Sequence, residues 1–172
     1  MIKKLLKTGA TTLLEIVIYF TIFGVILLVS TTFAIQILNV NKLSSNFNEV
    51  QSNISLVSNK VIAAIQEADS IDVANSVFDN DQGALTLIMP TPALSPTKFY
   101  LSSNNLYMVQ GIGTPEKLNS TITEFNILRF HRVSYPKSRD QVVIDIRAGV
   151  AANSLQQLDK TLDSHFSISL RK

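Results

Sequence analysis

The chain has 172 residues, of which 46% are hydrophobic and 16% charged, and this size suits a single domain. Its 15 Lys and Arg residues nearly balance its 13 Asp and Glu residues, which argues against a nucleic acid or an acidic substrate as the partner. The absence of cysteine excludes disulfides, cysteine-based zinc sites and cysteine nucleophiles.

The chain opens with a short basic segment that leads into a long apolar one. Lys3, Lys4 and Lys7 have no acid among them, and residues 16–38 carry no charge. A helix of about 20 apolar residues crosses a bilayer core of about 30 Å. We therefore expect a membrane-spanning helix with the lysines on the cytoplasmic side and the rest of the chain outside. A cleaved signal peptide fits less well, because its apolar core normally has about 7–15 residues.

Glu15 is a single charge at the start of the apolar stretch, and the next charge is Lys42. A carboxylate inside hydrocarbon costs about 2.5–3.5 kcal/mol on insertion scales, and less near the end of a span. No Lys or Arg stands three or four residues further along, where an ion pair within the helix would form. We therefore expect the partner of Glu15 to come from another chain or from a newly made N-terminus.

The residues around Glu15 resemble the type IV prepilin motif, with Gly-Ala-Thr-Thr-Leu-Leu-Glu over residues 9–15 before an apolar helix. In that family a basic leader ends in Gly, sometimes Ala. A prepilin peptidase cuts there and methylates the new N-terminus, and a Glu is the fifth mature residue. The resemblance makes Ala10 the last leader residue and Thr11 the first mature one. The alternative cut, between Gly9 and Ala10, moves Glu15 to the sixth position.

The resemblance implies a structural subunit of a type IV pilus, or of a type II secretion or competence pseudopilus. In the family, the glutamate of an incoming subunit neutralises the terminal amine of a neighbour, so Glu15 is the expected assembly residue. The implied partners are the membrane, other pilin or pseudopilin subunits, the prepilin peptidase and an assembly platform protein. The implied location is the cytoplasmic (inner) membrane, with an extracytoplasmic head, and then a surface or periplasmic filament.

The helical pattern continues beyond the apolar segment, because apolar residues recur at steps of three or four. They are Leu43, Phe47, Val50, Ile54, Val57, Val61, Ala64 and Ala68. No Pro or Gly interrupts residues 25–74. We expect one helix from about Thr12 to Ser70, roughly 85–90 Å long. In pilins the second half of this helix is buried under a β-sheet.

The rest of the chain reads as short strands separated by turns. The predicted strands cover residues 84–89, 98–101, 106–110, 122–133, 142–150 and 165–170. Turns or loops are predicted at 79–83, 102–105, 111–120 and 136–140, and residues 151–160 form either an inserted loop or a short helix. We therefore expect an α+β fold in which a long N-terminal helix, transmembrane in its first half, packs against a small antiparallel β-sheet of four to six strands.

This pattern divides the chain into four segments. They are a basic leader (1–10), a transmembrane and filament-core helix half (11–38), an amphipathic helix half (39–70) and a β-rich head (71–172). A single-span membrane protein with an extracytoplasmic binding head is the alternative to a filament subunit.

The head offers little that resembles a chemical site. Asp79, Asp81 and Gly83 resemble the opening of a calcium loop, but the later ligands are missing and a plain turn fits better. His131 and His165 are the only histidines, and neither belongs to a cluster with metal-ligand spacing. No P-loop, nucleophile elbow or paired-carboxylate motif is present. We therefore expect neither an enzyme nor a cofactor.

A loose basic group near one predicted hairpin is the remaining candidate site. Its members are Arg129, Arg132, Lys137 and Arg139. Phosphate contacts through such a group would make the chain a DNA-binding uptake pilin. A solvated sheet edge is the better interpretation, because no aromatic platform accompanies the charges, and we expect nucleic acid to be an unlikely partner.

Overall fold

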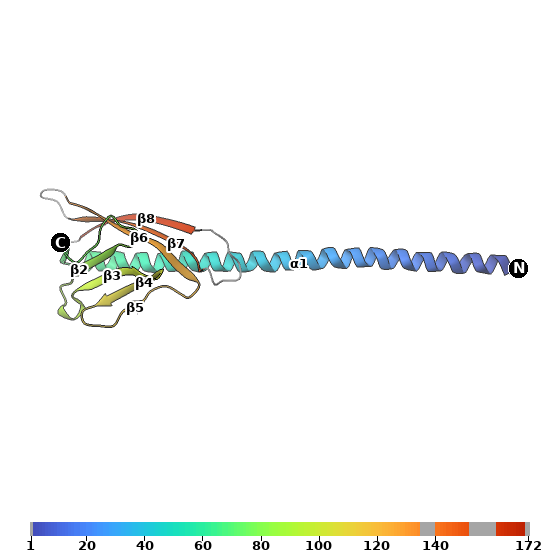
Figure 1. Cartoon of the computed structure of the whole chain (residues 1–172), viewed down its shortest axis with the longest axis horizontal. Helices are drawn as coiled ribbons and strands as arrows, with labels where there is room; N and C mark the ends of the chain where they lie inside the picture. Colours follow the sequence, from blue (N-terminus) through green and yellow to red (C-terminus); the bar gives the residue numbers. More distant parts are fainter. Residues whose placement is uncertain (1, 135–139, 152–160, 171–172) are drawn as a thin grey trace. The chain divides into compact units, whose positions relative to one another are not determined.

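The computed structural model describes residues 2–134, 140–151 and 161–170, with side chains from residue 12 onward. The element order is α1 (Ile2–Glu67), β1 (Ser70–Ile71), β2 (Ala84–Ile88), η1 (Pro92–Leu94), β3 (Thr97–Ser102), β4 (Asn105–Gln110), β5 (Glu116–Lys117), β6 (Thr123–Val133), β7 (Gln141–Val150) and β8 (Thr161–Ser169) (Figure 1). The chain forms two compact units, Met1–Ser44 and Ser45–Lys172, and α1 contributes to both. The predicted turn at 136–140 and the segment 151–160 fall almost wholly outside the described residues.

The helix α1 is longer at its start and shorter at its end than the sequence predicted. It begins at Ile2 because the Lys- and Leu-rich residues before Thr12 are good helix formers and contain only one Gly. It ends at Glu67 because the next residues form hydrogen bonds with strand β2 of the first sheet. The Asp69 N–H donates to the Ile88 carbonyl at 2.9 Å, and Ser70 pairs with Ile88.

The strands confirm the α+β class but form two antiparallel sheets in place of one. The first has the order β1-β2-β3-β4-β5 and the second the order β6-β7-β8. Strands β1 and β5 were not predicted, because each has only two residues and so shows no alternation. Strand β8 begins at Thr161, four residues earlier than predicted, because its polar first half pairs with β7 up to Gly149.

The hydrophobic core of the second unit lies between the C-terminal part of α1 and both sheets (Figure 1). The helix contributes Val50, Ile54, Val57, Val61 and Ile65, and Ala68 joins them just after the helix ends. The largest sheet residues in the core are Phe99, Phe125 and Phe130. The predicted apolar stripe is therefore confirmed over its second half, with Ile65 added. Leu43 and Phe47, at its start, stay partly exposed.

The predicted turn at 79–83 joins the two sheets by backbone hydrogen bonds. The Gly83 N–H donates to the Leu128 carbonyl and the Leu128 N–H donates to the Asp81 carbonyl, both at 2.8 Å. A Cβ added at Gly83 would lie 2.7 Å from the Leu128 carbonyl oxygen. Only glycine fits this close approach of two backbones. The packing therefore explains why residue 83 is a glycine, without a calcium loop.

Two asparagines tie the loop between β5 and β6 to its surroundings. The Asn53 side chain on α1 accepts a hydrogen bond from the Ser120 N–H at 3.0 Å. The buried Asn119 amide accepts from the Leu106 N–H at 3.0 Å and donates to the Thr123 carbonyl at 2.6 Å. These amides satisfy backbone groups that pair with no strand, which an apolar side chain could not do.

We expect Ile65→Ala to destabilise the second unit by about 2–5 kcal/mol, because it leaves a cavity at a side chain with 0% exposure. The measurement is urea unfolding of the full chain in detergent, followed by the near-ultraviolet circular dichroism of tyrosine. The matched control is Leu56→Ala on the same helix, where the side chain is 46% exposed and the change should stay within about 0.5 kcal/mol. Equal losses for the two variants would contradict the assigned packing.

Candidate functional site: an exposed apolar helix with one carboxylate

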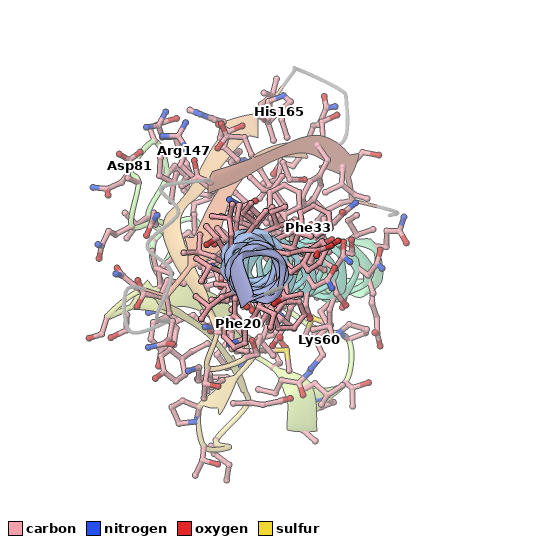
Figure 2. The ribbon with its side chains drawn as sticks, turned by 90° about the vertical axis from the view of Figure 1, so that its right-hand side faces the viewer. Phe20, Phe33, Lys60, Asp81, Arg147 and His165 are labelled. Carbon is pink, nitrogen blue, oxygen red and sulfur yellow. The ribbon has the colours of Figure 1, made fainter. Side chains whose placement is uncertain are left out.

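The first unit is a helix whose apolar side chains are uncovered. Phe20, for example, is 77% exposed, and every residue from Thr12 to Lys42 is exposed to solvent. Figure 2 looks along this helix and shows side chains projecting all around it, Phe20 and Phe33 among them. Among the described residues, one helix is long and apolar enough to cross a membrane, and it is this one. This agrees with the predicted anchor.

The three threonines within the apolar segment form hydrogen bonds to the backbone of their own helix. The hydroxyls of Thr21, Thr31 and Thr32 donate to the carbonyls four residues earlier, at 2.8 to 2.9 Å. None of these three threonines therefore has an unpaired hydroxyl donor. This arrangement suits a helix in hydrocarbon, where water cannot satisfy polar groups.

Glu15 is exposed near the start of this surface and has a partner on its own helix. The Tyr19 hydroxyl donates to Glu15 Oε1 at 3.0 Å, four residues further along. The sequence rule that excluded an ion pair considers only Lys and Arg at this spacing, so it does not predict a neutral donor. The carboxylate thus has one hydrogen bond and no cation among the described residues.

The residues of the predicted cut lie inside α1. The backbone of Gly9, Ala10 and Thr11 is helical, and their side chains fall outside the described part of the structure. The geometry therefore does not choose between the two bonds.

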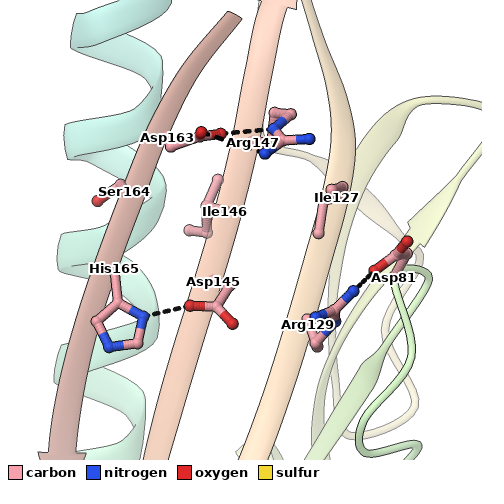
Figure 3. Close-up of a pocket in the computed structure, with 9 residues that line it drawn as sticks. All are labelled: Asp81, Ile127, Arg129, Asp145, Ile146, Arg147, Asp163, Ser164 and His165. Atoms are coloured by element: carbon pink, nitrogen blue, oxygen red, sulfur yellow. Dashed lines mark hydrogen bonds and ion pairs between the residues drawn. The ribbon is translucent and has the colours of Figure 1, made fainter.

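A second feature is a charged groove on the outward side of the three-stranded sheet (Figure 3). It encloses about 500 Å³ and is lined by Asp81, Ile127, Arg129, Asp145, Ile146, Arg147, Asp163, Ser164 and His165. Arg147 Nε lies 2.6 Å from Asp163 Oδ1, and Arg129 pairs with Asp81. The hydrogen bond from Arg147 lowers the pKa of Asp163, and Asp163 in turn raises the pKa of Arg147. Both arginines of the groove therefore already hold a carboxylate.

The two histidines meet at one carboxylate beside this groove. His165 Nδ1 contacts Asp145 Oδ1, and His131 Nε2 lies 3.4 Å from Asp145 Oδ2. His131 also pairs with Asp79. Strand register explains the meeting, because Asp145 is directly opposite His165 and both point outward. No group of three or more His, Asp or Glu among the described residues is arranged to hold a metal ion.

The predicted basic group is divided by the structure. Arg129 pairs with Asp81, and Arg132 Nη2 lies 2.8 Å from Asp140 Oδ2. Lys137 and Arg139 lie outside the described residues. The sequence did not predict these pairings, because Asp81 comes from a turn 48 positions away from Arg129.

Comparisons of the chain with models of protein families, with curated proteins and with solved structures find no match. The features that bear on function are therefore the motif around Glu15, the uncovered apolar helix and the α+β head.

We expect the Arg132–Asp140 pair to make stability depend on acid pH. The hydrogen bond from Arg132 lowers the pKa of Asp140 below its ordinary value. A lowered folded-state pKa stabilises the fold above about pH 4, and this contribution is lost as the pH falls through the folded-state value. Because the pair is partly exposed, Asp140→Asn should cost a few tenths to about 1 kcal/mol at pH 6.

The measurement is the urea midpoint of wild type and Asp140→Asn between pH 6 and pH 2. The two curves should converge in acid, where Asp140 is protonated and resembles asparagine. Arg132→Gln is the matched control. The double variant Arg132→Gln/Asp140→Asn should be only slightly less stable than either single variant, because each change already breaks the same ion pair. A gap between wild type and variant that stays constant down to pH 2 would refute the role of the charge.

Proposed function

We propose that this protein is a structural subunit of a type IV pilin-like filament, held in the membrane by the first part of α1 and assembled through Glu15. The observation that carries the proposal is a single carboxylate at the start of the uncharged stretch 16–38 of α1, whose side chains are all exposed. The prepilin-like residues 9–15 and the α+β head are consistent with it. The filament is a type IV pilus, or a type II secretion or competence pseudopilus.

The role of Glu15 follows from the environment that its helix requires. In hydrocarbon an unpaired carboxylate is unfavourable, and so is an unpaired terminal amine. An ion pair between Glu15 of one subunit and the N-terminus of the next neutralises both groups at once. Such a pair forms in one axial register only, so it sets how far each subunit is displaced along the filament. Glu15 is then a recognition residue and takes part in no reaction.

Processing would create the N-terminal amine with which Glu15 of another subunit pairs. A prepilin peptidase cuts between Ala10 and Thr11, or between Gly9 and Ala10, and N-methylates the new terminus. Removal of residues 1–10 takes away Lys3, Lys4 and Lys7, which hold the unprocessed N-terminus at the cytoplasmic face. The subunit then leaves the membrane for a surface or periplasmic filament with the help of an assembly platform protein. The proposal includes no enzymatic activity and no cofactor.

The charged groove favours one competing function, a single-span membrane protein whose head binds a ligand. Its residues include three carboxylates, two arginines and a histidine within about 500 Å³. The two arginines of the groove already pair with carboxylates, and so does Arg132. The described members of the predicted basic group, Arg129 and Arg132, therefore offer little free charge for DNA phosphates. The filament proposal is preferred because it also accounts for Glu15.

We expect the mature protein to begin at Thr11 and to carry a methylated N-terminus. N-terminal sequencing and intact mass of the protein from its producing cell test this directly. A start at Ala10 would support the same processing at the alternative bond. An intact Met1 would contradict processing by a prepilin peptidase. So would a start near Ile35, which is where a signal peptidase would leave the chain after cutting behind Thr32-Phe33-Ala34.

We also expect Glu15→Ala to leave membrane insertion intact and to block incorporation into filaments, because the cost of the charge disappears together with the docking partner. The measurement compares the subunit in the membrane fraction with the subunit in sheared or crosslinked filaments. The matched control is Glu67→Ala at the other end of α1, where an exposed glutamate lies on the same helix. Normal incorporation of the Glu15→Ala subunit would refute the assigned role.

A further inference from the structure

We propose that Tyr19 is a positioning residue for Glu15: its hydroxyl holds the carboxylate in place before a second subunit docks. This inference rests on the proposed assembly role of Glu15 and adds a second residue to the same site. It starts from the hydrogen bond of 3.0 Å between Tyr19 Oη and Glu15 Oε1.

The helix geometry explains why this tyrosine reaches this carboxylate. Side chains on an α-helix lean toward its N-terminus, so a residue at i+4 lies over residue i. Tyr19 therefore extends back toward Glu15 and donates from its end. Only Oε1 takes part, and within the described residues Oε2 has no hydrogen-bond partner. That second oxygen stays open to an amine from another subunit.

The hydroxyl acts on Glu15 in two physical ways. A free glutamate side chain loses rotamer freedom when it docks, and a bond formed beforehand removes part of that loss from the docking step. A donor to a charged acceptor also makes one of the stronger hydrogen bonds, and it offsets part of the cost of a carboxylate before any cation arrives. The first effect favours docking, while the second stabilises the subunit equally before and after docking, because the bond to Oε1 need not break.

The ring of Tyr19 has a separate place in the same surface. Together with Ile16, Phe20, Ile22, Phe23 and Ile26 it lines an apolar hollow on the helix. Tyrosine suits the boundary between hydrocarbon and headgroups, because its ring is apolar and its end is polar. A test must therefore remove the hydroxyl and keep the ring, which Tyr19→Phe does.

The experiment measures incorporation of the full-length Tyr19→Phe subunit into filaments of the producing cell, beside wild type and Glu15→Ala. We expect a few-fold to roughly tenfold less incorporation, the size expected when docking must order a free side chain, with unchanged membrane insertion. Thr21→Val is the matched control. It also removes a hydroxyl from this part of the helix, but that hydroxyl donates to the Val17 carbonyl at 2.8 Å and not to Glu15.

A second measurement does not depend on assembly. In bicelles, the carboxyl ¹³C signal of Glu15, assigned by its loss in Glu15→Gln, should move in Tyr19→Phe and stay in place in Thr21→Val. An unmoved Glu15 signal in Tyr19→Phe would overturn the positioning role, because the hydroxyl would then not hold the carboxylate.

The outcomes separate the two proposals. If Glu15→Ala blocks incorporation while Tyr19→Phe assembles normally, the positioning role is wrong and the assembly role of Glu15 stands. If Tyr19→Phe is normal and Tyr19→Leu is defective, the ring matters and the hydroxyl does not. If Glu15→Ala itself assembles normally, both proposals fall.

Discussion

The constraint on which the structure depends is the uncovered apolar surface of the first part of α1. Its Ile, Leu, Val and Phe side chains are exposed along the helix, and each would gain about 1.5–3 kcal/mol on burial. Water is therefore a poor environment for this segment, while lipid or other apolar helices are good ones. The internally bonded threonines and the single carboxylate with its tyrosine partner are the details that this environment requires.

The second unit meets the opposite requirement, because it must be stable in water on its own core. The helix adds one apolar stripe to two sheets, and Phe99, Phe125 and Phe130 fill the space between them. On the outside, the three-stranded sheet carries many charges, but they are arranged in pairs that cross from strand to strand. Pairing of this kind leaves the described basic side chains of this sheet little free charge with which to attract polyanions.

The sequence predicted what depends on periodicity and failed where an element is too short to show any. The second half of the helix stripe and the long strands follow repeats of 3.6 or 2 residues, and both are present. The hairpin at 102–105, predicted from its turn residues, is present too. Strands β1 and β5 have two residues each, and they are defined only by their hydrogen bonds to the neighbouring strands β2 and β4. At the site, Glu15 was evident as a lone charge, but Tyr19 was not, since its contribution depends on a hydroxyl that hydropathy does not register. The meeting of His131 and His165 at Asp145 depends on strand register, which one sequence does not reveal.

The end of α1 has a mechanical consequence. Only Ala68 and Asp69 separate the helix from β1, and the helix is already fixed in the core from Val50 onward. No flexible linker therefore stands between the last turns of the helix and the sheet. Because a close-packed core is nearly incompressible, a pull on residues 50–67 is shared by the whole second unit and is not taken up by a stretching loop. In the filament proposed above, such a subunit would transmit load through the packing of its core.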